Sequence, residues 1–245
     1  EVRTGGQPTH ERTVDRGNGT CIATGSAIPG DYIKAQSRSG LMGQQLIAVV
    51  GEGQSGRGYC TPSDHDSEAA ESAEPPWKPE GRNPEKLTGG TVFIYGLDEW
   101  WKLFTPRQLT ALTTFSDLLS EVRERVIADA AAKGVIDDGV RLRDGGSGAT
   151  AYADAITTYL AFVVDKCTDY WSSISTWAQQ GFVGNTFGLQ AIPMTWDFAE
   201  TTPFSSSTGN WMAMVNWVQK SIDHLPASGS GEVVQRDARA RVREA

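Results

Sequence analysis

The hydrophobic positions follow a helical period most clearly over residues 106–133. Apolar residues recur there every three or four positions, as on one face of an α-helix. They are Leu109, Leu112, Phe115, Leu119, Val122 and Val126. Thr105, Pro106 and Gln108 match a capping box with proline at the first helical position, and Gly134 is a natural end. The pattern therefore predicts one long helix with a defined start and stop.

The same period predicts a second long helix over 152–177 and a shorter helix over 210–225. Gly145-Gly146-Ser147-Gly148 precedes the second helix. A glycine-rich loop at a helix N-terminus can hold a phosphate, but the Lys-Ser/Thr ending of a phosphate-binding loop is missing here. A flexible connector between helices is the favoured interpretation.

The N-terminal part of the chain has the pattern of short strands. Two β-prone segments, 11–15 and 19–23, flank a turn-like cluster at 16–18. The compact apolar run 45–50 predicts a further strand, and 57–61 can return as its partner after a glycine-rich turn.

Composition divides the chain into four parts, and together they predict an α+β fold. Residues 1–61 are β-rich, and residues 62–90 are an acidic, proline-rich linker with seven acidic residues against three basic ones. A mainly helical domain follows over 91–230 and begins with a predicted short strand at 91–95. Residues 231–245 contain a predicted strand that ends in an aspartate.

Composition and charge narrow the function. The formal net charge of −8 disfavours a free-standing binder of the nucleic-acid backbone, because such proteins are usually basic. Three cysteines exclude a disulfide scaffold and cannot complete a four-cysteine zinc site. No apolar run approaches a membrane span and no signal peptide is visible, so we expect a cytoplasmic protein with no membrane partner.

Local sequence suggests no catalytic residue. No Ser/His/Asp or Cys/His arrangement stands out. Eight tryptophans could stack on nucleic-acid bases, but several fall on the apolar helix faces, so core packing is favoured for most of them. Glu74-Pro75-Pro76-Trp77 is similar to the Asp-Pro-Pro-Tyr loop of DNA amino-methyltransferases, but it lies in the acidic linker and is better explained as part of that linker.

Three strings carry a family resemblance. They are LFTPRQLTALTT at 103–114, NTFGLQAIPMTWDFAE at 185–200, and PFS at 203–205 with GNW at 209–211. Through them the chain resembles the interior of the large adenine-specific DNA methylases that carry a zinc ribbon and a DUF1156 region. In that family the S-adenosylmethionine glycine loop lies N-terminal to this stretch and the Asp-Pro-Pro-Tyr loop lies C-terminal to it.

The resemblance implies that the chain is a large insertion in a Rossmann-like methyltransferase. The parent would transfer a methyl group from S-adenosylmethionine to adenine N6 in DNA, and the chain is expected to be inactive alone. Residues 1–34 resemble the second half of the family's zinc ribbon. Thr24 stands where a cysteine is expected, so this zinc-ribbon half is degenerate and zinc binding is not expected.

The resemblance also implies candidate contacts. Asp237 ends a strand that resembles the one leading to an acidic residue near the cofactor adenine, although it is equally explained as a solvated aspartate in a charged tail. Arg107, Arg123 and Arg125 are candidate contacts to DNA phosphate, or solvated charges on the first helix, which is the favoured interpretation.

Two alternatives remain open at this point. The chain could be a non-enzymatic helical module that binds a protein partner, which an exposed apolar patch would support. It could also be a free-standing, sequence-tolerant nucleic-acid binder, which a steep salt dependence of binding would reveal.

Overall fold

The computed structural model describes residues 13–15, 17–53, 56–85, 91–189 and 191–226. These residues form a mainly helical α+β structure with two small antiparallel sheets. The predicted strand within 231–245 lies outside the described residues.

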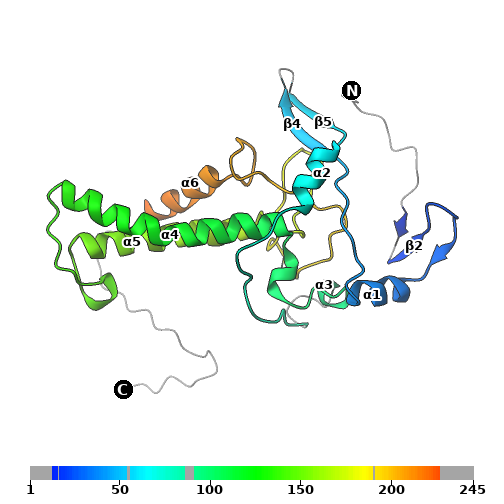
Figure 1. Cartoon of the computed structure of the whole chain (residues 1–245), viewed down its shortest axis with the longest axis horizontal. Helices are drawn as coiled ribbons and strands as arrows, with labels where there is room; N and C mark the ends of the chain where they lie inside the picture. The colour runs from blue at the N-terminus through cyan, green and yellow to red at the C-terminus, as the bar shows by residue number, and fades with distance from the viewer. Residues whose placement is uncertain (1–12, 16, 54–55, 86–90, 190, 227–245) are drawn as a thin grey trace, which may run out of the picture.

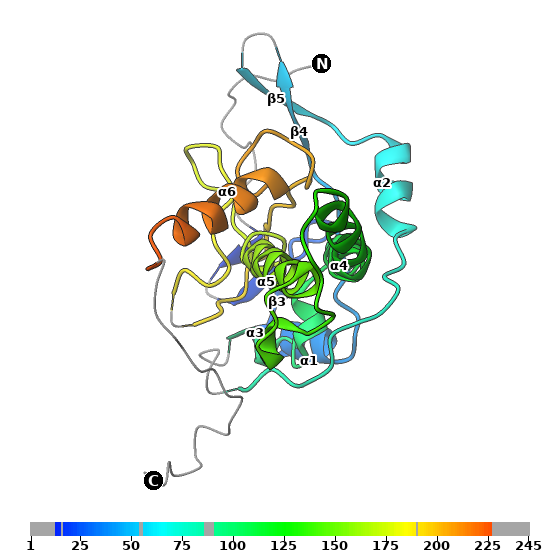
Figure 2. The same cartoon turned by 90° about the vertical axis from the view of Figure 1, so that its left-hand side faces the viewer.

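Three helices form the body of the molecule: α4 (Pro106–Ala132), α5 (Ala149–Thr168) and α6 (Trp211–Ile222). Figure 1 shows them gathered on one side of the molecule, and in Figure 2 α5 lies between α4 and α6. The core between them comprises Leu112, Val163, Cys167, Tyr170, Trp171 and Met214. The helices predicted over 106–133 and 210–225 are thus confirmed.

Side-chain caps explain why two of these helices begin where they do. Thr105 Oγ1 accepts a hydrogen bond from Gln108 N at 3.2 Å, and Gln108 Oε1 accepts one from Thr105 N at 2.9 Å. The predicted capping box at the start of α4 is therefore confirmed. At α6, Asn210 Oδ1 accepts from Ala213 N at 2.9 Å and satisfies an otherwise free backbone donor.

Helix α5 ends at Thr168, so the prediction of a helix continuing to residue 177 is wrong. Serine side chains after this point hydrogen-bond the backbone and replace helical bonds. Ser175 Oγ donates to Tyr170 O at 2.9 Å, and Ser172 Oγ accepts from Ile174 N at 3.0 Å. The apolar residues continue their spacing because this irregular segment is itself buried in the core.

The predicted strand at 91–95 is also wrong: the segment forms the one-turn helix α3 (Thr91–Ile94). No strand among the described residues pairs with it. Val92 is fully buried in a second core cluster with Leu103, Ile174 and Ile192. Its apolar character therefore reflects burial rather than a sheet. The 3-10 helix η1 (Trp100–Leu103) then leads into α4.

The N-terminal sheet consists of three very short antiparallel strands. These are β1 (Val14–Asp15), β2 (Asn18–Thr20) and β3 (Ala27–Ile28). The turn predicted around Gly17 is confirmed, since this glycine has a φ of 84°, which favours a residue without Cβ. Helix α1 (Gly30–Arg38), which the sequence pattern did not predict, follows the sheet.

The second sheet is the hairpin of β4 (Val49–Gly53) and β5 (Gly56–Cys60). The predicted return strand is confirmed, but β4 begins four residues later than the apolar run that predicted it. Val49 pairs with Cys60 at the open end, so residues 45–48 lie beyond the partner strand. The length of β5 therefore limits that of β4.

The acidic segment 62–90 contains structure that its composition did not predict. Helix α2 (Asp64–Glu71) begins with a capping box between Ser63 and Asp66. Further along, Asn83 is buried and its backbone N–H bonds to Asp98 O at 2.8 Å. The segment thus packs against the helical domain.

The loop that joins α4 to α5 is held by hydrogen bonds, contrary to the prediction of a flexible connector. After η2 (Leu142–Asp144), Ser147 N donates to Asp138 Oδ2 at 3.1 Å. Thr150 N and Oγ1 both donate to the Asp137 carboxylate at 2.9 Å. These bonds lower the pKa of Asp137, the backbone bond from Thr150 contributing most. The chain's own carboxylates therefore occupy the helix N-terminus where a phosphate would bind.

Replacing Gly146 with alanine is expected to destabilise the protein by about 2 kcal/mol. A Cβ at this position would lie 2.1 Å from Val140 O, so the backbone of the loop would have to move. The free energy of unfolding in urea measures the effect. Gly43→Ala is the matched control, because a Cβ there meets nothing within 4 Å, and it is expected to be neutral. Equal stabilities of the two variants would contradict the close packing of this loop.

Within the described part of the chain, each helix is too short or too polar to cross a lipid bilayer.

Candidate functional site

A hollow of about 280 Å³ opens where the start of α4 meets the segment before α6. It is lined by Arg107, Gln108, Ala111, Trp171, Glu200, Thr201, Thr202 and Pro203. We call it the α4 hollow. The capping box fixes the first turn of α4, and thereby the position of two polar side chains in its wall.

An ion pair forms one wall of the α4 hollow. Arg107 Nε and Nη2 each lie 2.8 Å from Glu200 Oε2, and both side chains are partly buried. The two residues are 93 positions apart in the sequence. Their charges balance, and within the described part of the chain they are the two ionisable residues that line the hollow.

Three buried polar atoms of the lining have no hydrogen-bond partner within the described residues. They are Gln108 Nε2, Glu200 Oε1 and Thr201 Oγ1. Gln108 is only 5% exposed, and its Oε1 is used by the helix cap, so its amide nitrogen is left as a free donor. A buried polar group without a partner costs about 1–3 kcal/mol. Three of them around one hollow indicate a place built to be completed by another molecule.

Aromatic side chains form the apolar side of the site. Trp171 is 1% exposed, and its Nε1 donates to Gly209 O at 2.6 Å. Phe115 lies beside it, with ring centroids 5.7 Å apart, and stacks on Trp211 at 4.2 Å. Phe204, next to the lining residue Pro203, is 85% exposed. Closely packed aromatic rings therefore support the apolar side of the α4 hollow, and Trp171 itself is almost fully buried.

The lining offers side chains that can bind another molecule through hydrogen bonds. The Glu200 carboxylate and the Arg107 guanidinium are paired with each other, and among the described residues neither a cysteine nor a histidine lines the hollow.

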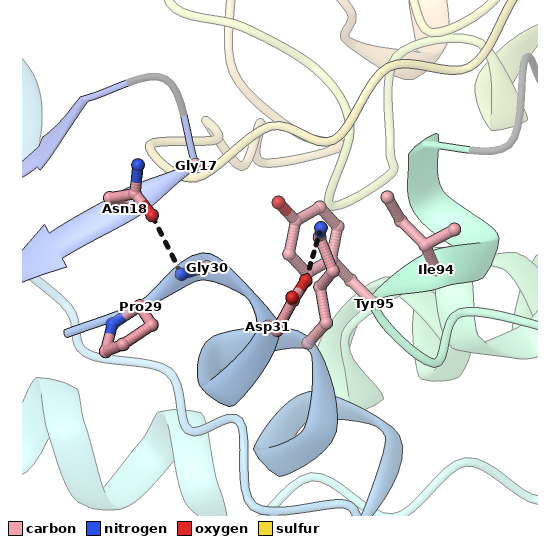
Figure 3. Close-up of a pocket in the computed structure, with 8 residues that line it drawn as sticks. Gly17, Asn18, Pro29, Gly30, Asp31, Ile94 and Tyr95 are labelled. Atoms are coloured by element: carbon pink, nitrogen blue, oxygen red, sulfur yellow. Dashed lines mark hydrogen bonds and ion pairs between the residues drawn. The ribbon is translucent and has the colours of Figure 1, made fainter.

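A second hollow, of about 450 Å³, lies between the N-terminal sheet, the start of α1 and α3. Figure 3 shows that the polar groups of its wall bind one another. Gly30 N donates to Asn18 Oδ1 at 2.9 Å, and Lys34 pairs with Asp31 at 3.2 Å. Tyr95 closes one side. None of the unpartnered buried side-chain atoms of the described residues belongs to this wall, so we favour the α4 hollow.

The structure separates the three arginines predicted to contact DNA. Arg107 pairs with Glu200 in the α4 hollow, and Arg123 pairs with Asp154 and Glu124. Their positions on α4 lie about 24 Å apart along the helix axis.

Arg125 differs from the other two arginines. It is exposed, and among the described residues it has no ion pair. A phosphate would therefore meet a free guanidinium only at this one of the three positions. Asp237, the predicted cofactor contact, lies outside the described residues.

Residues 21–26, within the segment predicted to be a degenerate zinc-ribbon half, form a tight turn that begins at Cys21. Gly25 N donates to Cys21 O at 2.8 Å, and Cys21 N donates to Ser26 O at 2.9 Å. A hydrogen bond from the Thr24 side chain contributes most to lowering the pKa of the Cys21 thiol. In the described part of the chain, no three His, Cys, Asp or Glu side chains gather around a possible metal position.

Sequence reasoning assigned Gln108 to the helix cap and treated Arg107 as a candidate DNA contact or, preferably, a solvated charge. It missed Glu200, Thr201 and Trp171 as partners in one site. One signal was present: Arg107 and Glu200 both fall within the strings that carry the family resemblance. Nothing local showed that these strings meet.

Comparisons with protein-family models, curated proteins and solved structures found no match to this chain.

Proposed function

We propose that this chain is the central insertion segment of an S-adenosylmethionine-dependent, adenine-specific DNA methyltransferase and does not transfer methyl groups by itself. The cofactor glycine loop and the Asp-Pro-Pro-Tyr loop would belong to the surrounding parts of the parent protein. DNA would be a partner through the parent. The insertion would support the parent's fold and position surfaces beside its active site.

One observation carries the proposal: the strings of the family resemblance meet around one hollow. The string 103–114 provides Arg107, Gln108 and Ala111, the string 185–200 provides Glu200, and the last string provides Pro203. Segments about ninety positions apart in the sequence have no local reason to resemble the same family. A common site, to which all of them contribute residues, provides such a reason. The resemblance thus follows a tertiary unit and is not confined to one helix.

Contacts with the parent's ligands are part of the same proposal. Asp237 would approach the cofactor, and Arg125 would be the free cation available to a DNA phosphate. Arg107 and Arg123 would first have to give up their carboxylate partners, which is unfavourable for partly buried pairs.

Sequencing the DNA on both sides of this reading frame tests the proposal. We expect an in-frame glycine-loop motif upstream and an Asp-Pro-Pro-Tyr motif downstream. The isolated chain should transfer no labelled methyl group from S-adenosylmethionine to DNA, whereas the longer protein should. Methyl transfer by the isolated chain, or flanking DNA without either motif, would refute the proposal.

A helical protein-binding module remains the second candidate function. The observation that favours it is the exposure of large apolar side chains in and around α6. They are Phe204, Met212, Trp217 and Leu225, which are 85%, 61%, 59% and 56% exposed. Such side chains are typical of surfaces covered by a partner. Crosslinking at Met212 would capture a specific protein if this function is correct, and would yield no specific product if it is not.

A further inference from the structure

We propose that the α4 hollow binds a small uncharged molecule through an amide-type edge, in which a hydrogen-bond acceptor and a donor lie side by side. A carboxamide and the lactam or amidine edge of a nucleobase both have this chemistry. The proposal concerns this chain's own residues and does not depend on its being part of a methyltransferase.

The charge of the lining selects an uncharged ligand. The site has one cation, Arg107, and one anion, Glu200, and they bind each other at 2.8 Å. An ionic ligand would bring an unbalanced charge into a partly buried place, which is costly without an opposite partner. A free phosphate or carboxylate is therefore disfavoured.

The unpartnered atoms determine the hydrogen bonds that the ligand must make. Gln108 Nε2 can only donate, so it requires an acceptor on the ligand. Glu200 Oε1 is a carboxylate oxygen that can only accept, so it requires a donor. Thr201 Oγ1 can do either. A ligand that carries both an acceptor, such as C=O or a ring N, and a donor, such as N–H or NH₂, meets both fixed requirements.

The size and shape of the α4 hollow fit one planar group. Its volume of about 280 Å³ lies just below the range of about 300–1,000 Å³ that is typical of small-molecule sites. Ala111 and Pro203 offer apolar contact, Trp171 adds little because it is 1% exposed, and Phe204 stands exposed beside the lining. Planar amides and heteroaromatic rings pack well on such surfaces.

The decisive experiment uses the full chain and ligand-observed NMR, with affinities from calorimetry. The probes are nicotinamide, uridine and adenosine, which all present the required edge. The matched negative probes are N,N-dimethylnicotinamide and 3-methyluridine, because methylation removes the N–H that would donate a hydrogen bond to Glu200. We expect saturable binding of the edge-bearing probes and at least tenfold weaker binding of the methylated ones.

Thr201→Val supplies the matched protein variant. Valine keeps the shape and removes a hydroxyl that has no partner in the described structure, so the melting temperature should stay the same or rise. Binding of the best probe should nevertheless weaken about tenfold, because one ligand hydrogen bond is lost. Increased stability with weakened binding is a combination that a purely structural role would not produce.

Two further variants complete the design. Gln108→Glu keeps an oxygen for the helix cap but replaces the donor with an acceptor, so binding should fall more than in Thr201→Val. Thr157→Val is the control, because the Thr157 hydroxyl bonds only to carbonyls of its own helix and its residue does not line the hollow. Its affinity should equal that of the unmodified chain.

The outcomes separate clearly. Binding of nicotinamide alone would support the proposal and identify a non-nucleoside carboxamide, and binding of nucleosides alone would support it and identify a base. Absence of binding by every probe up to its solubility limit would overturn it. So would equal binding of the methylated probes, or unchanged affinity in Thr201→Val. None of these measurements involves methyl transfer. Failure of this proposal would therefore not refute the proposed function, which the flanking DNA and the methyl-transfer assay test separately.

Discussion

Replacing Trp171 with alanine is expected to lower the free energy of unfolding by about 4 kcal/mol. Trp171 is 1% exposed in the core between the helices, and it also lines the α4 hollow. Its removal would leave a large cavity beside Phe115 and leave Gly209 O without the indole donor. Since the free energy of unfolding of an ordinary domain is about 5–15 kcal/mol, little stability would remain.

Urea unfolding, monitored by circular dichroism, measures this loss of stability. Two further variants show which part of the Trp171 side chain causes it. Trp171→Phe keeps a ring but loses the indole N–H, so about half of the loss, near 2 kcal/mol, is expected. Trp217→Ala removes a tryptophan that is 59% exposed, and its effect should stay within about 1 kcal/mol. A Trp171→Ala protein as stable as Trp217→Ala would contradict the placement of Trp171 in the core.

Asp154→Asn is expected to destabilise the protein by about 3 kcal/mol, because it removes the charge of a buried carboxylate that two arginines bind. The side chain of Asp154 is 9% exposed. Its two oxygens accept from Arg123 Nε at 2.8 Å and from Arg141 Nε at 2.6 Å, and Leu142 N adds a third bond at 3.1 Å. Asparagine keeps the shape but leaves Arg141 without an ion pair among the described residues and leaves Arg123 with only the exposed Glu124. The cluster joins α4 to α5 and to the loop between them.

The pH dependence of the same variant gives an independent check. Burial alone would raise the pKa of Asp154, but hydrogen bonds from Arg141 and Arg123 outweigh it and lower the pKa from 3.8 to about 2. A carboxyl group with a lowered folded-state pKa stabilises the protein above its unfolded pKa, and this contribution is lost as the pH falls through the folded value. The stability difference between the unmodified chain and Asp154→Asn should therefore be constant above pH of about 4 and shrink toward pH 2.

Asp31→Asn is the control for this experiment. Its carboxylate is 97% exposed and pairs with Lys34 on the surface, where solvent and salt screen the interaction. No measurable loss of stability is expected. A pH-independent difference for Asp154→Asn would show that its carboxylate does not carry the predicted charge interaction.

The contrast between α4 and α5 shows how far local sequence reaches. Helix α4 was predicted with its N-terminus correct because Thr105, Pro106 and Gln108 are all within four positions of one another. Helix α5 has an equally clear apolar period, but its C-terminal end was misplaced. The period continues into a buried irregular segment, and burial alone produces the same pattern of residues.

The candidate site was less accessible to sequence reasoning than the helices. The sequence shows that Arg107 is a cation. Whether it is free to bind a phosphate depends on Glu200, whose carboxylate lies 93 positions away in the sequence and pairs with it. Arg123 likewise depends on Asp154, 31 positions away. Charge in a sequence indicates what a side chain can bind, while only the folded chain shows whether a partner is already present.

The sequence by itself determined the features whose causes are local. These are the start of α4, the cap of α6 by Asn210, the turn at Gly17 and the overall α+β character. Tertiary structure decided the helical form of α3, the end of α5 and the meeting of Gln108, Glu200 and Thr201 around one hollow. The physical reason is that caps and turns are closed by neighbouring residues, whereas burial, ion pairing and unpartnered polar atoms depend on segments that only folding brings together.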